Sequence, residues 1–315
     1  MENLRIVFMG TPEFAVGILD HIVTQGFNVV GVVTAADKPA GRGKQIRQSA
    51  VKEFAIKNSL PVLQPLSLKD PAFLSELADL QANVQVVVAF RMLPDVVWKM
   101  PKLGTFNLHA SLLPQYRGAA PINWAIINGE KQTGVTTFFI DDKIDTGAMI
   151  LSKTTEIGPH ENAGELHDRL MDLGRVAVVE TLEQISSGEV NRVPQPEHNN
   201  LKDAPKLNKD NTRLDWNASA KAIENQIRGL SPYPAAWCYF RDGEREWQVK
   251  ILAAEKMTED NYTKPGKIST TKKEIIVSAQ DGSLNILRLQ VAGKKVMTAS
   301  ELLNGMSFSP DAIAC

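Results

Sequence analysis

Three residues of types that together catalyse acyl transfer lie close to predicted strand ends. Asn107 and His109 are two residues apart in an apolar stretch, residues 105–110. Residues two apart on a β-strand project from the same face, so the amide and the imidazole are expected to point together. Asp145 follows another predicted strand, within residues 141–147. An amide can donate a hydrogen bond to a developing oxyanion, an imidazole can move protons, and a carboxylate can orient the imidazole.

Each of these residues also has a simpler interpretation that the sequence leaves open. A lone histidine on a strand is often a hydrogen-bonded core residue. Asp145 precedes Thr146 and Gly147, so it fits a turn cap. Ser111 is a possible nucleophile, but no G-x-S-x-G elbow surrounds it.

Two other kinds of site are not expected. The remaining histidines are dispersed and no H-E-x-x-H occurs, so we predict no metal site: His21, His160, His167 and His198. The turn Gly10-Thr11-Pro12 lacks the G-x-G-x-x-G pattern, and Pro12 has no N–H to offer a pyrophosphate. A carboxylate or terminal phosphate could still bind at the start of the helix that follows.

The elements expected around these residues form an α/β domain. Residues 4–9 and 28–34 are short apolar runs typical of buried strands, and a helix with Thr11 as N-cap and Pro12 as its first residue is predicted between them. Strand, helix, strand implies a parallel sheet. Further strands are predicted at 61–64, 84–90 and 105–110, a partly antiparallel pair at 134–140 and 148–155, and helices at 49–58, from Asp70, at 121–128 and at 161–187. The prediction is a Rossmann-like, doubly wound, mostly parallel sheet with its ligand site at the carboxyl edge.

A second domain is expected after a linker. The 315 residues suggest two domains, and we place their boundaries at 1–189, 190–208 for the linker and 209–315. The linker has several prolines and asparagines and little periodicity. The last part shows one helix at 217–228, about five short strands and a short helix at 298–303, which favours an OB-like β-barrel.

Charge is uneven along the chain, although the net charge is −1. Residues from Lys206 onward carry a net +3, and the preceding residues carry −4. A basic segment at 37–52, which contains two glycines, stands out within the acidic half, so a polyanion could be attracted at two places. Only two cysteines occur, which fits a reducing cytoplasm, and neither a signal peptide nor an apolar run long enough to span a membrane is expected.

The joined pattern Asn107-x-His109-x-Ser111-Leu-Leu-Pro-x-Tyr-Arg-Gly118, with Asp145-Thr-Gly147 after it, resembles the folate-dependent formyltransferase superfamily. The resemblance implies that Asn107, His109 and Asp145 transfer a formyl group from 10-formyltetrahydrofolate to an amine, without a metal. It also implies that folate lies near residues 90–94 and 140–144, held mainly by backbone. The cofactor-binding residues implied are Ser111, Leu112, Leu113, Pro114, Phe90, Met92 and Asp142.

Within the superfamily the chain resembles the branch that formylates methionyl-tRNA. Residues 9–15, the basic insertion 36–44, residues 109–124 and the size of the last domain carry this resemblance. It implies formylation of the α-amino group of methionyl-initiator-tRNA, which gives N-formylmethionyl-tRNA for translation initiation. A monomer is expected, because no large exposed apolar stripe is evident in the sequence. Competing interpretations are an amino-sugar formyltransferase, a formylfolate hydrolase and a non-catalytic RNA-binding protein.

Charge placement and the resemblance together imply contacts with tRNA. The expected tRNA-binding residues are Lys38, Arg42, Lys44, Arg47, Lys206 and Lys209, with Lys294 and Lys295 as further basic residues of the barrel.

One position departs from the family pattern. Arg91 stands where the family usually has glycine, next to the expected pterin pocket. If the backbone there needs a positive φ, arginine is unfavourable.

Overall fold

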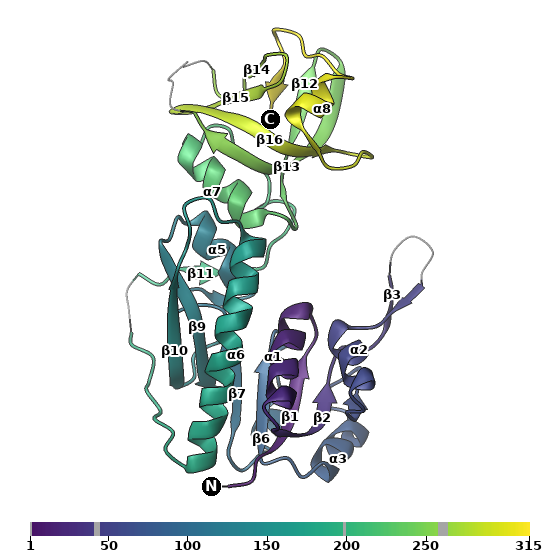
Figure 1. Ribbon diagram of the computed structural model, residues 1–315, viewed down its shortest axis with the longest axis vertical. Coiled ribbons are helices and arrows are strands. Elements are labelled where there is room, and N and C mark those ends of the chain that lie inside the picture. The colour runs from purple at the N-terminus through teal and green to yellow at the C-terminus, as the bar shows by residue number, and fades with distance from the viewer. Residues whose placement is uncertain (1, 41–44, 198–199, 258–263) are drawn as a thin grey trace. The chain divides into compact units, whose positions relative to one another are not determined.

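The computed structural model describes residues 2–40, 45–197, 200–257 and 264–315 (Figure 1). The chain forms two compact units, each described here by itself. The N-terminal unit comprises Met1–Gly118, Thr133–Thr155 and His167–Asp203. The C-terminal unit comprises Ala119–Gln132, Glu156–Leu166 and Ala204–Cys315, so two short segments that interrupt the N-terminal unit along the chain belong to it.

A seven-stranded sheet forms the centre of the N-terminal unit. In spatial order its strands are β10 (Met149–Glu156), β9 (Gln132–Phe139), β7 (Thr105–His109), β6 (Val84–Val88), β1 (Arg5–Gly10), β2 (Asn28–Val33) and β5 (Val62–Leu63). The pairs from β7 through β6, β1 and β2 to β5 are parallel, whereas β7 and β9 are antiparallel. The predicted doubly wound, mostly parallel sheet is therefore confirmed.

Helices cover this sheet and fix the position of β7. They are α1 (Glu13–Thr24), α2 (Ala50–Lys57), α3 (Pro71–Asp79), α4 (Asp95–Trp98) and the long α6 (Ala163–Ser187). Figure 1 shows α6 beside α1 in front of the strands. The close approach depends on glycine, because a Cβ at Gly17 would lie 2.4 Å from Met171 Sδ, and one at Gly174 would lie 2.7 Å from a methyl carbon of Leu108. Packing against Leu108 supports β7 from the face opposite Asn107 and His109.

The start of α1 differs from the sequence prediction. Pro12, not Thr11, is the N-cap residue, the helix begins at Glu13, and no side chain caps it. The reason is that β1 continues through Gly10, and Pro12 keeps an extended ψ of 176° while its carbonyl accepts from Ala15 N. The predicted start of α3 is confirmed: Asp70 caps it by accepting from Ala72 N, and Pro71 is its first residue.

The basic segment after β2 contains a strand pair that the sequence did not predict. Strands β3 (Lys38–Ala40) and β4 (Gln45–Arg47) are antiparallel, with Lys38 opposite Arg47. Arg42 and Lys44, both expected to bind tRNA, lie outside the described residues.

The C-terminal unit is a nearly closed antiparallel barrel, which confirms the OB-like prediction. Its sheet runs β14 (Ile268–Thr270), β15 (Ile275–Ala279), β16 (Gly282–Val291), β13 (Arg245–Lys256), β12 (Ala236–Asp242) and β18 (Ile313–Ala314), with β17 (Met297–Thr298) beside β16. Ala314 N donates to Gly266 O at 2.7 Å, and Lys267 bridges to Ile313, so the first and last strands of this order meet. Helices α5 (Pro121–Ile127), α7 (Ala220–Leu230) and α8 (Ala299–Leu303) complete the unit.

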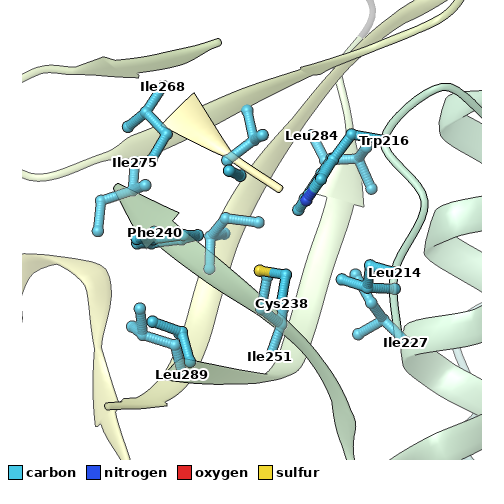
Figure 2. Close-up of a cluster of buried hydrophobic side chains, with 14 of the residues drawn as sticks. Leu214, Trp216, Ile227, Cys238, Phe240, Ile251, Ile268, Ile275, Leu284 and Leu289 are labelled. Atoms are coloured by element: carbon cyan, nitrogen blue, oxygen red, sulfur yellow. The ribbon is translucent and has the colours of Figure 1, made fainter. Parts of the chain in front are cut away.

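The barrel has its own core. Figure 2 shows Cys238 and Phe240 of β12 among Ile251, Leu284 and Leu289 from neighbouring strands. All five side chains are fully enclosed. Burial raises the pKa of the Cys238 thiol to about 12, because the thiolate would lose its hydration. Cys238 is therefore part of the hydrophobic core.

Candidate active site

Strand β7 ends in the residues that the sequence singled out. Asn107 is half-buried and His109 is 6% exposed, and both project from the same face of the strand. His109 Nε2 lies 2.8 Å from the carbonyl oxygen of Tyr116. A carbonyl oxygen only accepts hydrogen bonds, so Nε2 carries a hydrogen and donates it there. This bond fixes the orientation of the ring.

Asp145 reaches His109 by a route that the sequence did not reveal. Because β9 runs antiparallel to β7, its last residue, Phe139, pairs with Phe106 rather than with the carboxyl end of β7. Residues 140–148 return, and Asp145 Oδ2 lies 3.7 Å from His109 Nδ1. The same oxygen accepts from Gly118 N at 2.9 Å. Asp145 adopts a φ of 55°, in the left-handed region that few non-glycine residues occupy.

His109 and Asp145 lie within ion-pair distance of each other, so they form an ion pair when the ring is protonated. One ring nitrogen is occupied by a backbone carbonyl, and the other faces a carboxylate. A hydrogen-bonded core histidine would need only the first contact. A turn cap would bond to N–H groups of its own turn, whereas Asp145 accepts from Gly118 of β8 (Arg117–Gly118), a different segment. The geometry therefore favours the catalytic interpretation of both residues over the simpler ones.

Ser111 and the residues after it form a tightly bonded loop. Ser111 is fully buried, and its hydroxyl donates to Gln115 O at 2.6 Å. Thr136 Oγ1 donates to Ser111 O at 2.7 Å and lies 3.2 Å from Leu113 N, from which it accepts. The peptide between Leu113 and Pro114 is cis. Leu112 is half-buried, while Leu113 and Pro114 are buried. A hydroxyl held by a backbone carbonyl is a structural contact, so the nucleophile interpretation of Ser111 gains no support.

The two segments expected near the pterin present apolar side chains to solvent. Met92 is 64% exposed and Ile144 is 61% exposed, and Asp142 is exposed as well, whereas Phe90 is half-buried. Arg91 has no positive φ; the left-handed residue of this loop is Ala89, with a φ of 47°. Arginine at position 91 is therefore free of that strain.

Arg91 also has a structural task in this loop. Its guanidinium donates to Pro65 O at 2.6 Å and to Leu66 O at 3.0 Å. These bonds connect the loop after β6 to the segment after β5.

The basic residues expected to bind tRNA are found at the surface where they are described. Lys38, Arg47, Lys206 and Lys209 are exposed. In the C-terminal unit, Lys209 Nζ lies 5.2 Å from the Trp237 ring centroid, and the Arg213 guanidinium lies 5.5 Å from it. Lys209 and Arg213 thus form a pair of exposed cations that covers the buried ring of Trp237.

Sequence reasoning missed Gln195. The segment that carries it was predicted as a linker, because prolines and low periodicity gave no sign of fixed structure. In the structure Val193 and Met149 exchange both backbone hydrogen bonds, at 2.8 and 2.9 Å. Gln195 Nε2 then donates to Asp145 O and Gly147 O.

The described part of the chain has neither a cluster of metal-ligating side chains nor a membrane-spanning helix. Among those residues no three histidine, cysteine or acidic side chains gather in a way that could hold a metal ion. Within the same ranges no helix has the length and apolar character needed to cross a membrane.

The chain belongs to the formyl transferase family. The family domain described as formyl transferase matches residues 4–182, and the domain described as formyl transferase, C-terminal domain, matches residues 206–307. The two matches together extend over both units. The arrangement of Asn107, His109 and Asp145 falls within the first of them.

Full-length relatives place the chain more narrowly, with the methionyl-tRNA formyltransferases. It is 61% identical to the methionyl-tRNA formyltransferase of Flavobacterium johnsoniae, over 99% of both chains. The methionyl-tRNA formyltransferase of Bacteroides fragilis is 52% identical, over 98% of this chain and 97% of its own.

Solved structures agree on the fold. The sugar 3N-formyl transferase WlaRD superposes with a TM-score of 0.67 at 20% identity, over 94% of this chain and 100% of its own. HypX from Aquifex aeolicus in complex with tetrahydrofolic acid superposes with a TM-score of 0.65 at 18% identity, over 98% of this chain and 49% of its own.

Proposed function

We propose that the protein transfers the formyl group of 10-formyltetrahydrofolate to the α-amino group of methionyl-initiator-tRNA. The observation that carries this proposal is the pairing of His109 with Asp145, on the same face as Asn107, in a chain 61% identical to a methionyl-tRNA formyltransferase over its full length. The product, N-formylmethionyl-tRNA, serves translation initiation.

The chemistry is an acyl transfer to nitrogen. The folate supplies a formyl carbon; the amine nitrogen forms a bond to it, the bond from that carbon to the folate nitrogen breaks, and the proton lost by the amine is balanced by one gained by the folate nitrogen. Asn107 donates its amide N–H to the formyl oxygen, where negative charge develops. His109 stabilises the same charge and moves protons. Asp145 holds the ring and assists removal of the proton from the amine.

The described residues fit a folate cosubstrate. Exposed Met92 and Ile144 offer apolar surface to a flat ring. The left-handed residue Ala89 turns the chain directly after β6, so backbone groups of residues 89–94 are presented at the sheet edge. We assign the pterin to this edge, with Phe90 and Asp142 beside it and with Ser111, Leu112, Leu113 and Pro114 as the wall.

The tRNA is assigned to two basic surfaces. Lys38 and Arg47 are directly opposite each other on β3 and β4. Like charges in such a pair destabilise a sheet, and a phosphate near them would offset the repulsion. In the C-terminal unit, exposed Lys209 and Arg213, which lie over the buried ring of Trp237, offer cations to the phosphates of the nucleic acid, and Lys206 adds a further charge. Arg42 and Lys44, which lie outside the described residues, are proposed to bind tRNA together with Lys38 and Arg47.

The experiment offers 10-formyltetrahydrofolate together with methionyl-tRNA, with a nucleotide-linked amino sugar, or with buffer alone. Formylmethionine and released tetrahydrofolate are both measured. We expect transfer to methionyl-tRNA alone, and a loss of ~10²–10³ in kcat for His109→Ala and Asp145→Ala. Transfer to the sugar, or release of formate in buffer, would replace the proposed substrate, and wild-type turnover in folded His109→Ala would overturn the assigned roles.

Binding of tRNA is tested by its salt dependence. Affinity should fall steeply as salt rises, because counterions are released from the phosphates. Replacing a single phosphate contact, in Lys209→Ala, should lower the slope of log K against log salt by ~1. A slope that Lys209→Ala leaves unchanged would remove this residue from the interface.

A further inference from the structure

Gln195 is fixed in place by the loop that carries Asp145. Its side-chain Nε2 donates to Asp145 O at 2.8 Å and to Gly147 O at 2.9 Å. Both hydrogens of the amide group are therefore used on one turn. The backbone of its own segment is anchored two residues earlier, where Val193 pairs with Met149.

The oxygen of the same amide group holds Arg117. Gln195 Oε1 accepts from Arg117 Nη2 at 2.6 Å and from Nε at 3.1 Å. The orientation of the amide is unambiguous, because carbonyl oxygens only accept and a guanidinium only donates. The Gln195 side chain thus makes four hydrogen bonds.

Arg117 stands between the two backbone groups that support the catalytic pair. Its predecessor, Tyr116, supplies the carbonyl that accepts from His109 Nε2. Its successor, Gly118, supplies the N–H that donates to Asp145 Oδ2. Gln195 therefore joins the segment that orients His109 to the turn that carries Asp145. It also bonds to the carbonyl of a residue whose φ of 55° is unfavourable without such support.

We propose that Gln195 is a positioning residue for formyl transfer, which sets the distance between Asp145 and His109. This inference rests on the proposed function, in which that pair moves protons. Gln195 is not assigned a contact with substrate. Its effect is expected in kcat, with KM for methionyl-tRNA little changed, because it acts on the placement of the catalytic groups.

Two variants separate positioning from simple packing. Gln195→Glu keeps the length of the side chain and the acceptor for Arg117, but places an oxygen against the carbonyls of Asp145 and Gly147. Gln195→Ala removes all four bonds. We expect kcat to fall ~10²-fold in both, as for a misplacement of about 1 Å. If Gln195→Glu kept the wild-type kcat, Gln195 would serve only as a spacer or as a partner of Arg117, and the positioning role would be refuted.

Matched controls come from Asn83, whose side-chain amide lies away from the site and also makes hydrogen bonds through both its oxygen and its nitrogen. Asn83 Oδ1 accepts from Arg5 N at 2.7 Å, and Nδ2 donates to Asn3 O at 2.9 Å. These groups lie at the amino ends of β1 and β6, whereas His109 is at the carboxyl end of β7. Asn83→Ala and Asn83→Asp should change stability and leave kcat near the wild-type value.

A double-mutant cycle tests whether Gln195 acts through Asp145. In an Asp145→Ala background, Gln195→Ala should cause less than about a twofold further loss of kcat, because residues that act as one unit are not additive. A further ~10²-fold loss would overturn the inference. If Asp145→Ala itself kept wild-type kcat, the assigned catalytic roles would fail instead.

A measurement without substrate decides the inference even if methionyl-tRNA is not formylated. The chain has five histidines, so the ring ¹⁵N signals of His109 can be assigned by comparison with His109→Ala. Gln195→Ala should move these signals in the direction that Asp145→Ala moves them, and Asn83→Ala should leave them in place. Unmoved His109 signals in folded Gln195→Ala would refute the positioning role.

Discussion

Gly147 makes the placement of Asp145 open to a steric test. A Cβ added at Gly147 would lie 1.7 Å from Phe139 O and 2.9 Å from Phe139 C. Both are backbone atoms of the last residue of β9, and β9 is held against β7 through the pairing of Phe139 with Phe106. In Gly147→Ala the turn, rather than the strand, is therefore the part expected to move.

The size of the movement follows from the same contact. Real Cβ atoms essentially never approach closer than 3.0 Å, so the 1.7 Å separation must grow by more than 1 Å. Asp145 is two residues away, and its Oδ2 now lies 3.7 Å from His109 Nδ1. A displacement of about 1 Å at catalytic groups lowers rates by ~10²-fold. Overpacking of this kind also lowers the free energy of unfolding by ~1–3 kcal/mol.

The assay is formyl transfer to methionyl-tRNA, with kcat and KM measured separately and folding checked by circular dichroism. Gly305→Ala is the matched control, because its added Cβ would meet no atom within 4 Å. We expect Gly147→Ala to lose kcat while Gly305→Ala keeps it. A folded Gly147→Ala enzyme with wild-type kcat would show that the position of this turn does not limit the reaction.

Three further predictions concern stability and reactivity. At pH 8 iodoacetamide should label Cys315 but not Cys238 in the folded protein, because burial raises the pKa of the Cys238 thiol to about 12. In urea both thiols should be labelled. Equal labelling of the two thiols in the folded protein would contradict the enclosed core. Hydrogen bonds from Lys52 and Gln64 lower the pKa of Asp37, so its stabilising contribution is present above its unfolded pKa and is lost as pH falls through the lower folded value. The melting temperature of the wild type should therefore fall more steeply below about pH 4 than that of Asp37→Asn, and parallel curves would refute the coupling. Phe240→Ala empties a fully buried position of the barrel and should cost about 3–5 kcal/mol in urea unfolding of the C-terminal unit, whereas a loss below about 1 kcal/mol would mean that the core closes around the gap.

Much of the fold was accessible from local signals. Short apolar runs such as those of β1 and β6 are long enough to mark buried strands, and Asp70 with Pro71 marked the start of α3 correctly. The start of α1 was predicted wrongly. The sequence placed the end of the strand before Gly10 and the N-cap at Thr11, whereas β1 continues through Gly10 and Pro12 is the N-cap. Two-residue strands such as β18 carry no periodicity, so the sequence predicted a barrel but not the segment that closes it.

The candidate site divides in the same way. Asn107 and His109 could be predicted to share a face, because a two-residue separation on one strand has only one geometric outcome. The approach of Asp145 could not be derived, since β9 is antiparallel to β7 and the loop must return to reach His109. Gln195 escaped prediction, because its polar, proline-rich surroundings look like a linker in sequence.

The sequence by itself determined the chemical groups, the face that Asn107 and His109 share, and the alternation of strands and helices that makes the sheet mostly parallel. These properties depend on neighbours along the chain. Only the tertiary structure decided that Asp145 faces His109 at 3.7 Å and that Gln195 and Arg117 link the segments beside them. Those contacts join residues 36 to 78 positions apart, whose meeting depends on strand direction and packing of the whole unit and not on any local pattern.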